Sequence, residues 1–178
     1  MAMSPRLGKF VLTAHVTFSV GWLGAVAVFL VLGVIGLTSQ DAQVVRSAYL
    51  VMEPAAWLVL IPLSLGSLLT GVIQSLGTRW GLFRHYWVLF KLVINVIATI
   101  VLLMYTETLS LFALVAAETS SDLSLLGTPS VMIHAGSALL LLLVATTLSV
   151  YKPRGMTRYG QRKQYEKRGL PDRALSRP

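Results

Sequence analysis

Four long apolar segments constrain the fold of this 178-residue chain more than any other feature of its sequence. Residues 10–37 and 54–78 contain no Lys, Arg, Asp or Glu, residues 82–105 carry charges only near their start, and residues 129–151 carry none. About 20 mostly apolar residues suffice for a helix to cross a bilayer. We therefore predict an all-α integral membrane protein in which residues 1–151 form a four-helix bundle.

The composition agrees with a membrane protein and excludes a soluble domain. Hydrophobic residues make up 55% of the chain and charged residues 12%, against about 25% charged residues in a typical soluble domain. The chain contains no cysteine, which excludes a disulfide framework, an iron–sulfur site and a thiol nucleophile.

The basic residues predict the orientation of the chain, because Lys and Arg concentrate in the cytoplasmic flanks of membrane helices. On one side of the bilayer, Arg46 is the only Lys or Arg in the predicted loops. The basic residues of the other side are Arg6, Lys9, Arg79, Arg84 and nine residues after position 151. We predict that both termini are cytoplasmic and that the loops 38–53 and 106–128 face outward.

Local signals place the ends of the second and third helices. Pro54 suits the first turn of a helix, where its missing amide donor is not needed, so we expect the second span to begin there and to kink at Pro62. The preceding residues 41–53 have the pattern of a short amphipathic helix at the outer interface or of a turn. The third helix ends near residue 105 or continues to residue 117, since a second apolar stretch follows.

Residues 152–178 form a basic cytoplasmic tail for which we predict no regular structure. The tail acts as an orientation signal, or it adsorbs to anionic lipid headgroups at about 1 kcal/mol per basic residue near the surface. We expect no nucleic-acid partner, because the aromatic residues of the tail are too sparse to stack on bases. The residues predicted to face lipid headgroups are Lys152, Arg154, Arg158, Arg162, Lys163, Lys167 and Arg168.

Three histidines lie in or at the predicted spans, where ionisable residues are costly and often functional. His15 and His85 belong to the cytoplasmic leaflet, whereas His134 lies in the outer leaflet, about 15 Å away in depth. His15 and His85 are therefore candidate axial ligands of haem b. Their candidate surroundings are Trp22, Arg84 and Lys91. The alternatives are a bare metal site, for which His134 is a candidate, and histidines that only satisfy structural hydrogen bonds.

Two further patterns point to polar groups inside the bundle. His15, Ser19 and Trp22 share one face of the first helix with Val26 and Phe29. A polar and small seam on the second helix is formed by Ser64, Ser67, Gly71, Gln74 and Thr78. The seam serves helix packing, or it lines a polar path with Thr70. Lys91 snorkels to the membrane surface, or it faces inward and neutralises the carboxylate or phosphate of a ligand.

The same residues recur in short motifs that resemble a family of small predicted bacterial integral membrane proteins, catalogued as a domain of unknown function. The resemblance implies a multi-pass protein of the bacterial plasma (inner) membrane and transfers no activity. A looser likeness, to copper-resistance and b-type-cytochrome four-helix membrane proteins, is carried by the intramembrane histidines. The motifs are His15 with 21–25, Thr70-Gly71, Trp80-Gly81-Leu82, Tyr86-Trp87 with Lys91, and 151–155.

The function hypotheses follow from what the spans contain. The sequence shows no phosphate-binding loop, no nucleophile elbow and no paired carboxylates within a span. The leading hypothesis is therefore a non-enzymatic accessory or assembly component, in a homo-oligomer or with another membrane protein. The alternatives are a haem or metal-binding membrane protein, with a role in electron transfer, and a small transporter subunit.

The charge asymmetry makes a direct prediction about topology. A reporter that is active only in the cytoplasm should be active when it is fused after Pro178. A reporter that is active only outside the cytoplasm should be active when it is inserted near Ser121. Activity measurements on paired fusions check this expectation. The reverse pattern would overturn the orientation.

Overall fold

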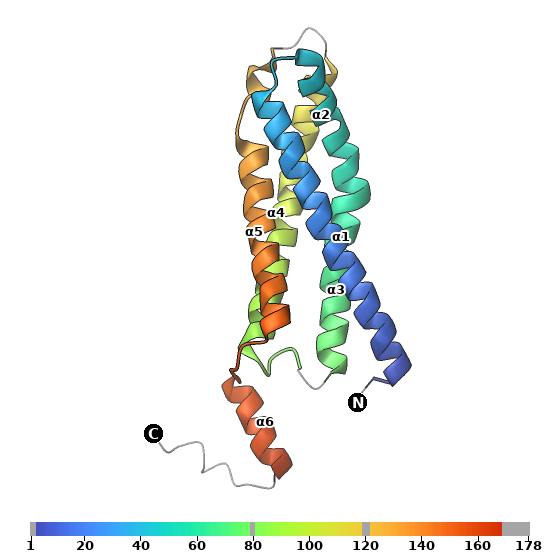
Figure 1. The fold of residues 1–178 in the computed structure, drawn as a ribbon, viewed down its shortest axis with the longest axis vertical. Helices are drawn as coiled ribbons and strands as arrows, with labels where there is room; N and C mark the ends of the chain where they lie inside the picture. The colour runs from blue at the N-terminus through green and yellow to red at the C-terminus, as the bar shows by residue number, and fades with distance from the viewer. Residues whose placement is uncertain (1–2, 79–80, 119–121, 169–178) are drawn as a thin grey trace.

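The computed structural model describes residues 3–78, 81–118 and 122–168. Within these ranges the chain is helical and has no strand beyond one isolated bridge, between His85 and Met156. Four helical segments are long and apolar enough to cross a membrane, which confirms the predicted all-α chain with four apolar spans (Figure 1). These segments are Pro5–Thr38, Ala42–Gly77, Tyr86–Ala117 and Leu123–Tyr151.

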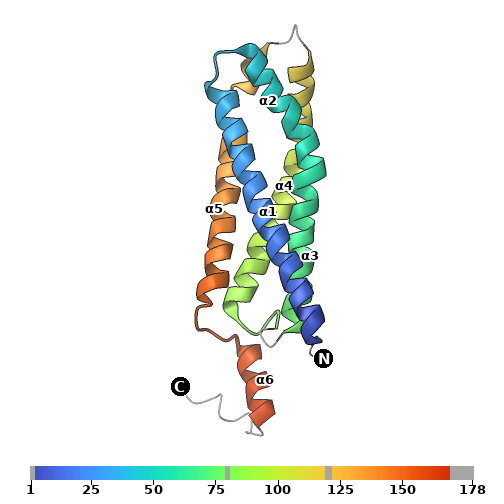
Figure 2. The ribbon, with the colours of Figure 1, turned by 45° about the vertical axis from the view of Figure 1, so that its right-hand side comes forward.

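The four segments pack side by side. Helix α1 (Pro5–Thr38) contacts α3 (Ile61–Gly77) and α5 (Ser130–Tyr151), and α4 (Tyr86–Ala117) contacts α2 (Ala42–Ala55), α3 and α5. The start of α1, the start of α4 and the end of α5 lie at one end of the molecule, which we call the terminal end (Figures 1 and 2). The start of α2 lies at the opposite end, which we call the distal end.

The second span begins earlier than the sequence predicts. Helix α2 already starts at Ala42, and it passes through a π-helical turn, Ala56–Leu60, directly into α3. Pro54 therefore lies inside a helix and not in its first turn. Proline removes a backbone hydrogen bond and crowds the preceding turn. The π turn lies on the N-terminal side of Pro62, in the turn that Pro62 crowds, and the helix continues through it.

The other three spans agree closely with the predicted segments. Helix α4 continues to Ala117, which is the longer of the two predicted ends. A short 3-10 turn, Leu123–Leu126, precedes α5.

The main hydrophobic cluster fills the middle and the distal half of the bundle. It includes Trp22, Val26 and Phe29 of α1, as the shared face predicted, together with Tyr49 and Met52 of α2. The hydroxyl of Tyr49 is fully buried and donates a hydrogen bond of 2.6 Å to the carbonyl of Leu126. Gly36 lets the ring approach, because a Cβ there would lie 2.8 Å from Cε2 of Tyr49.

The tail differs from the expectation of no regular structure, since Arg158–Arg168 forms helix α6. Thr157 explains where it starts. Its backbone N–H donates to the carbonyl of Arg84 at 3.0 Å, and its hydroxyl accepts from the N–H of Gly160 at 3.1 Å as a helix N-cap does. The segment is thus anchored to the residues before α4, and α6 extends away from the four spans (Figures 1 and 2).

The basic side chains of the tail are largely solvated where the structure describes them. Lys152, Arg154, Arg158 and Arg162 are exposed. The ammonium of Lys163 pairs with the Glu166 carboxylate at 2.9 Å, and this hydrogen bond raises the pKa of Lys163. The side chains of Lys167 and Arg168 lie outside the described part. Adsorption of the tail to anionic lipid therefore stays a prediction.

The buried Tyr49 hydroxyl gives a stability prediction. Tyr49→Phe removes the donor and leaves the Leu126 carbonyl unpaired in an apolar surrounding, so we expect a loss of about 1–3 kcal/mol in the free energy of unfolding. Thermal unfolding in a mild detergent measures the change. Tyr151→Phe, at a side chain that is 79% exposed, is the matched control and should change stability by less than about 0.5 kcal/mol. Equal midpoints for the two variants would contradict the role of Tyr49.

Candidate functional site

A group of polar side chains lies between α1 and α3, on the terminal side of the hydrophobic cluster. The Nδ1 atom of His15 lies 3.1 Å from the carbonyl oxygen of Ser67 and 3.2 Å from the hydroxyl of Thr70. One turn further along α1, the hydroxyl of Ser19 pairs with that of Ser67 at 2.8 Å. These contacts join the predicted polar face of α1 to the predicted seam of α3.

The hydrogen bonds fix the tautomer of His15. A carbonyl oxygen only accepts, so Nδ1 carries the proton and donates to Ser67. Thr70 is an acceptor for the same proton, because its own hydroxyl donates to the carbonyl of Gly66 at 2.5 Å. In the neutral ring, Nε2 then keeps a free lone pair.

Gly71 lets the imidazole come close to α3. A Cβ at this position would lie 3.0 Å from Cε1 of His15, which is tighter than ordinary van der Waals contact. The predicted small residue of the seam therefore has a specific neighbour, and this neighbour is a histidine ring rather than the backbone of another helix.

Helix α4 adds an ammonium group to this region. The Nζ atom of Lys91 lies 5.5 Å from the centre of the Trp87 ring, and the two residues share a face because they are four positions apart. Trp87 is buried, and so is Ala98 further along the same face. The Lys91 face of α4 is therefore turned into the bundle. Lys91 is also close enough to His15 to interact with it electrostatically.

Two buried polar atoms of α3 and α4 have no hydrogen-bond partner in the described part of the chain. They are Oε1 of Gln74 and Oγ1 of Thr99. Gln74 lies one turn from Thr70 on α3, and Thr99 lies two turns from Lys91 on α4. An unsatisfied buried polar atom costs about 1–3 kcal/mol, so each invites a ligand or a water molecule. We call His15, Ser19, Ser67, Thr70, Gln74 and Lys91 the polar site.

The polar site carries positive charge without a nearby carboxylate. Among the described residues, Lys91 makes no ion pair with Asp or Glu. The acidic residues of the four spans and their loops all belong to the distal half, and they are Asp41, Glu53, Glu107, Glu118 and Asp122.

The two candidate haem ligands have different surroundings. His15 lies at the contact of α1 with α3, whereas His85 precedes α4, with its ring centre 6.4 Å from that of Trp87 and its backbone bridged to Met156. Trp22 packs in the hydrophobic cluster, and Arg84 offers its carbonyl to Thr157. Haem ligation by these two histidines therefore stays a prediction from the sequence.

His134 has a structural environment at the distal end. Its exposed ring stacks on Tyr105, with ring centres 4.0 Å apart and planes 20° from parallel. Its Nδ1 atom lies 2.8 Å from the carbonyl of Ser130, and the Ser130 hydroxyl pairs with that of Tyr105 at 2.9 Å. Within the described ranges, no group of three or more His, Cys, Asp or Glu could hold a metal ion.

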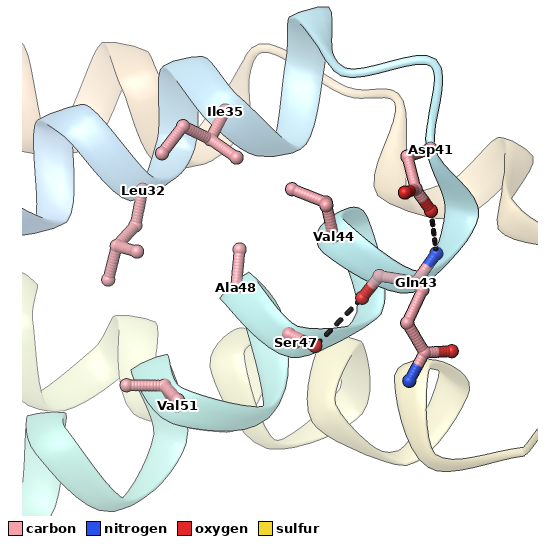
Figure 3. Close-up of a pocket in the computed structure, with 8 residues that line it drawn as sticks. All are labelled: Leu32, Ile35, Asp41, Gln43, Val44, Ser47, Ala48 and Val51. Atoms are coloured by element: carbon pink, nitrogen blue, oxygen red, sulfur yellow. Dashed lines mark hydrogen bonds between the residues drawn. The ribbon is translucent and has the colours of Figure 1, made fainter.

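A shallow groove of about 380 Å³ lies between the distal end of α1 and α2 (Figure 3). Leu32, Ile35 and Val51 line its apolar part. Its polar groups already serve the helix, because Asp41 accepts from the N–H of Gln43 at 2.8 Å and Ser47 donates to the Gln43 carbonyl at 2.8 Å. The groove thus offers apolar contact and no polar recognition.

Comparison of the chain with family models, with curated proteins and with solved structures finds no match. The chemistry of the polar site therefore carries the functional argument.

The contact between His15 and Thr70 was not predicted, although both residues were noticed separately. His15 lies ten residues after the start of α1, and Thr70 lies seven residues before the end of α3. Both helices have these ends at the terminal end, so the two residues lie at similar depth. Equal depth is the sequence signal that could have paired them.

The contact between Gly71 and His15 gives a packing prediction. Gly71→Leu should push the imidazole away from Ser67 and Thr70 and lower the free energy of unfolding by about 1–3 kcal/mol. Thermal unfolding in detergent and the ring chemical shifts of His15 report the two effects. Gly24→Leu is the control, because nothing lies within 4 Å of its Cβ position. If both variants unfold at the temperature of the parent, Gly71 has no packing role.

Proposed function

We propose that the chain is a multi-pass membrane protein of non-enzymatic type that binds a small polar ligand in the polar site. In this proposal the terminal end lies on the cytoplasmic side of the plasma membrane, and the ligand enters from there. The observation that carries the proposal is the hydrogen-bonded contact of His15 with Ser67 and Thr70 beside the inward ammonium of Lys91.

Helix packing alone does not account for this set of groups. Where the chain needs only packing, its hydroxyls bond to their own helix, as Ser64 does with the Ile61 carbonyl at 2.9 Å. Gln74 and Thr99 have no such partner, and Lys91 has a ring for a neighbour and no counter-ion among the described residues. Unpaired polar groups inside a span are costly and are typical of sites that bind a ligand.

The groups of the polar site suit binding better than bond cleavage. A hydroxyl nucleophile donates its proton to an adjacent base, whereas the Thr70 hydroxyl donates to the Gly66 carbonyl. The Nδ1 proton of His15 holds α1 against α3. This supports an accessory component that senses or carries its ligand for a membrane partner, in line with the leading hypothesis from the sequence.

Thiol labelling tests whether the polar site is open to water from the terminal end. The chain has no cysteine, so a single Thr70→Cys variant gives an unambiguous signal with a membrane-impermeant thiol reagent. Leu69→Cys is the matched control, because the Leu69 side chain precedes Thr70 in the chain and is 63% exposed on the apolar outer surface of α3. Only a thiolate reacts, and apolar surroundings raise the pKa of a thiol, with about tenfold less thiolate per pKa unit.

We expect Thr70→Cys to react at least about tenfold faster than Leu69→Cys, and only when the reagent is on the side of the terminal end. Inside-out and right-side-out vesicles separate the two sides. Equal rates for the two variants, or no reaction at Thr70→Cys from either side, would contradict an open polar site.

A further inference from the structure

We infer that the ligand of the polar site is an anion, bound through carboxylate or phosphate oxygens by the ammonium of Lys91 with Gln74 and His15 beside it. This inference rests on the proposed function and names its ligand class. It starts from the charge of the site, in which an inward ammonium lies within electrostatic range of an imidazole and has no carboxylate partner in the described ranges.

Lys91 is inside the bundle and not only at the membrane surface. A snorkelling lysine extends along lipid-facing surface toward the headgroups. Here the ammonium lies over the ring of Trp87, and Trp87 is only 8% exposed. The Lys91 side chain therefore runs along an interior face of α4, toward the terminal end.

The ammonium has unused donors. Lysine has three N–H donors, and the contact with the Trp87 ring is a cation–π interaction that does not use an acceptor atom. An unpaired charge within a membrane span is costly. An anion removes this cost by supplying both the counter-charge and the acceptors.

Gln74 and His15 can complete the set of donors. The Oε1 atom of Gln74 is buried and has no partner among the described residues. Rotation of the amide by half a turn exchanges it for the NH₂ group, which donates. His15 uses Nδ1 toward α3 and keeps Nε2, which becomes a donor when the ring is protonated beside an anion. A cationic ligand finds no matching set, since no carboxylate of the described residues faces this region.

Anions of this chemistry reach the terminal end from two sources. One is a free solute such as inorganic phosphate or a carboxylate, and the other is the headgroup of an anionic lipid in the adjacent leaflet. Both present the same oxygens to Lys91. The experiment therefore uses both kinds of probe.

The test measures protection of Thr70→Cys from an uncharged, hydrophilic thiol reagent in a neutral detergent. We expect inorganic phosphate, acetate or added phosphatidylglycerol to slow labelling in a saturable way, whereas chloride at equal ionic strength does not. Protection by phosphate or acetate assigns a free solute, and protection by the lipid alone assigns a headgroup. When Lys91→Gln is combined with Thr70→Cys, the anion concentration that gives half-maximal protection should rise at least about tenfold. Lys91→Arg should retain the protection, and Lys9→Gln, at an exposed lysine of α1, should leave it unchanged.

The outcomes separate this inference from the proposed function. If Thr70→Cys labels readily but no anionic probe protects it, the polar site is open and the anion inference is wrong. Protection that persists at full strength in Lys91→Gln also overturns it. The labelling contrast between Thr70→Cys and Leu69→Cys within the Lys91→Gln background shows that this variant is folded. If the single variant Thr70→Cys, with Lys91 unchanged, is not labelled, the proposed function itself is wrong.

Discussion

The structure depends on one constraint, which is that polar groups within an apolar span must find their partners inside the protein. The distal half meets it partly by contacts between elements and partly by bonds within one helix. Tyr49 reaches the carbonyl of Leu126, and Thr106 bonds to the carbonyl of Leu103 in its own helix at 2.7 Å. The half near the terminal end meets it by the contact of His15 with Ser67, and Oε1 of Gln74 has no partner in the described part of the chain. Hydrogen bonds between helical elements therefore help to hold the bundle together in both halves.

The same constraint explains the path of the second span. Pro54 and Pro62 each remove an amide donor from this continuous helical segment. The π turn Ala56–Leu60 lies directly before Pro62, in the turn that the proline ring crowds, and the chain stays helical to Gly77. As a result α2 and α3 act as one long element. It holds the buried Tyr49 at the distal end and Thr70 near the terminal end.

Much of the fold followed from the sequence because apolar length and helical spacing are local properties. The four spans, the buried face of Trp22 and the seam with Ser67 were predicted in this way. The continuity of α2 with α3 was not predicted, because Pro54 is also compatible with the first turn of a new helix. Helix α6 was missed because its anchor is a tertiary contact between Thr157 and Arg84. The pairing of His15 with Thr70 was missed for the same reason.

The central claim is that the polar site is open to water from the terminal end, whereas the hydrophobic cluster excludes water. Two spin labels on one inward face of α4 test this claim. One replaces Asn95, which lies one turn from Lys91, and the other replaces Leu102, which packs against the hydrophobic cluster. Collision rates with a water-soluble nickel chelate and with oxygen report the local medium at each label in lipid vesicles. The account predicts frequent chelate collisions at residue 95 and mainly oxygen collisions at residue 102. Equal chelate access at the two positions would contradict it.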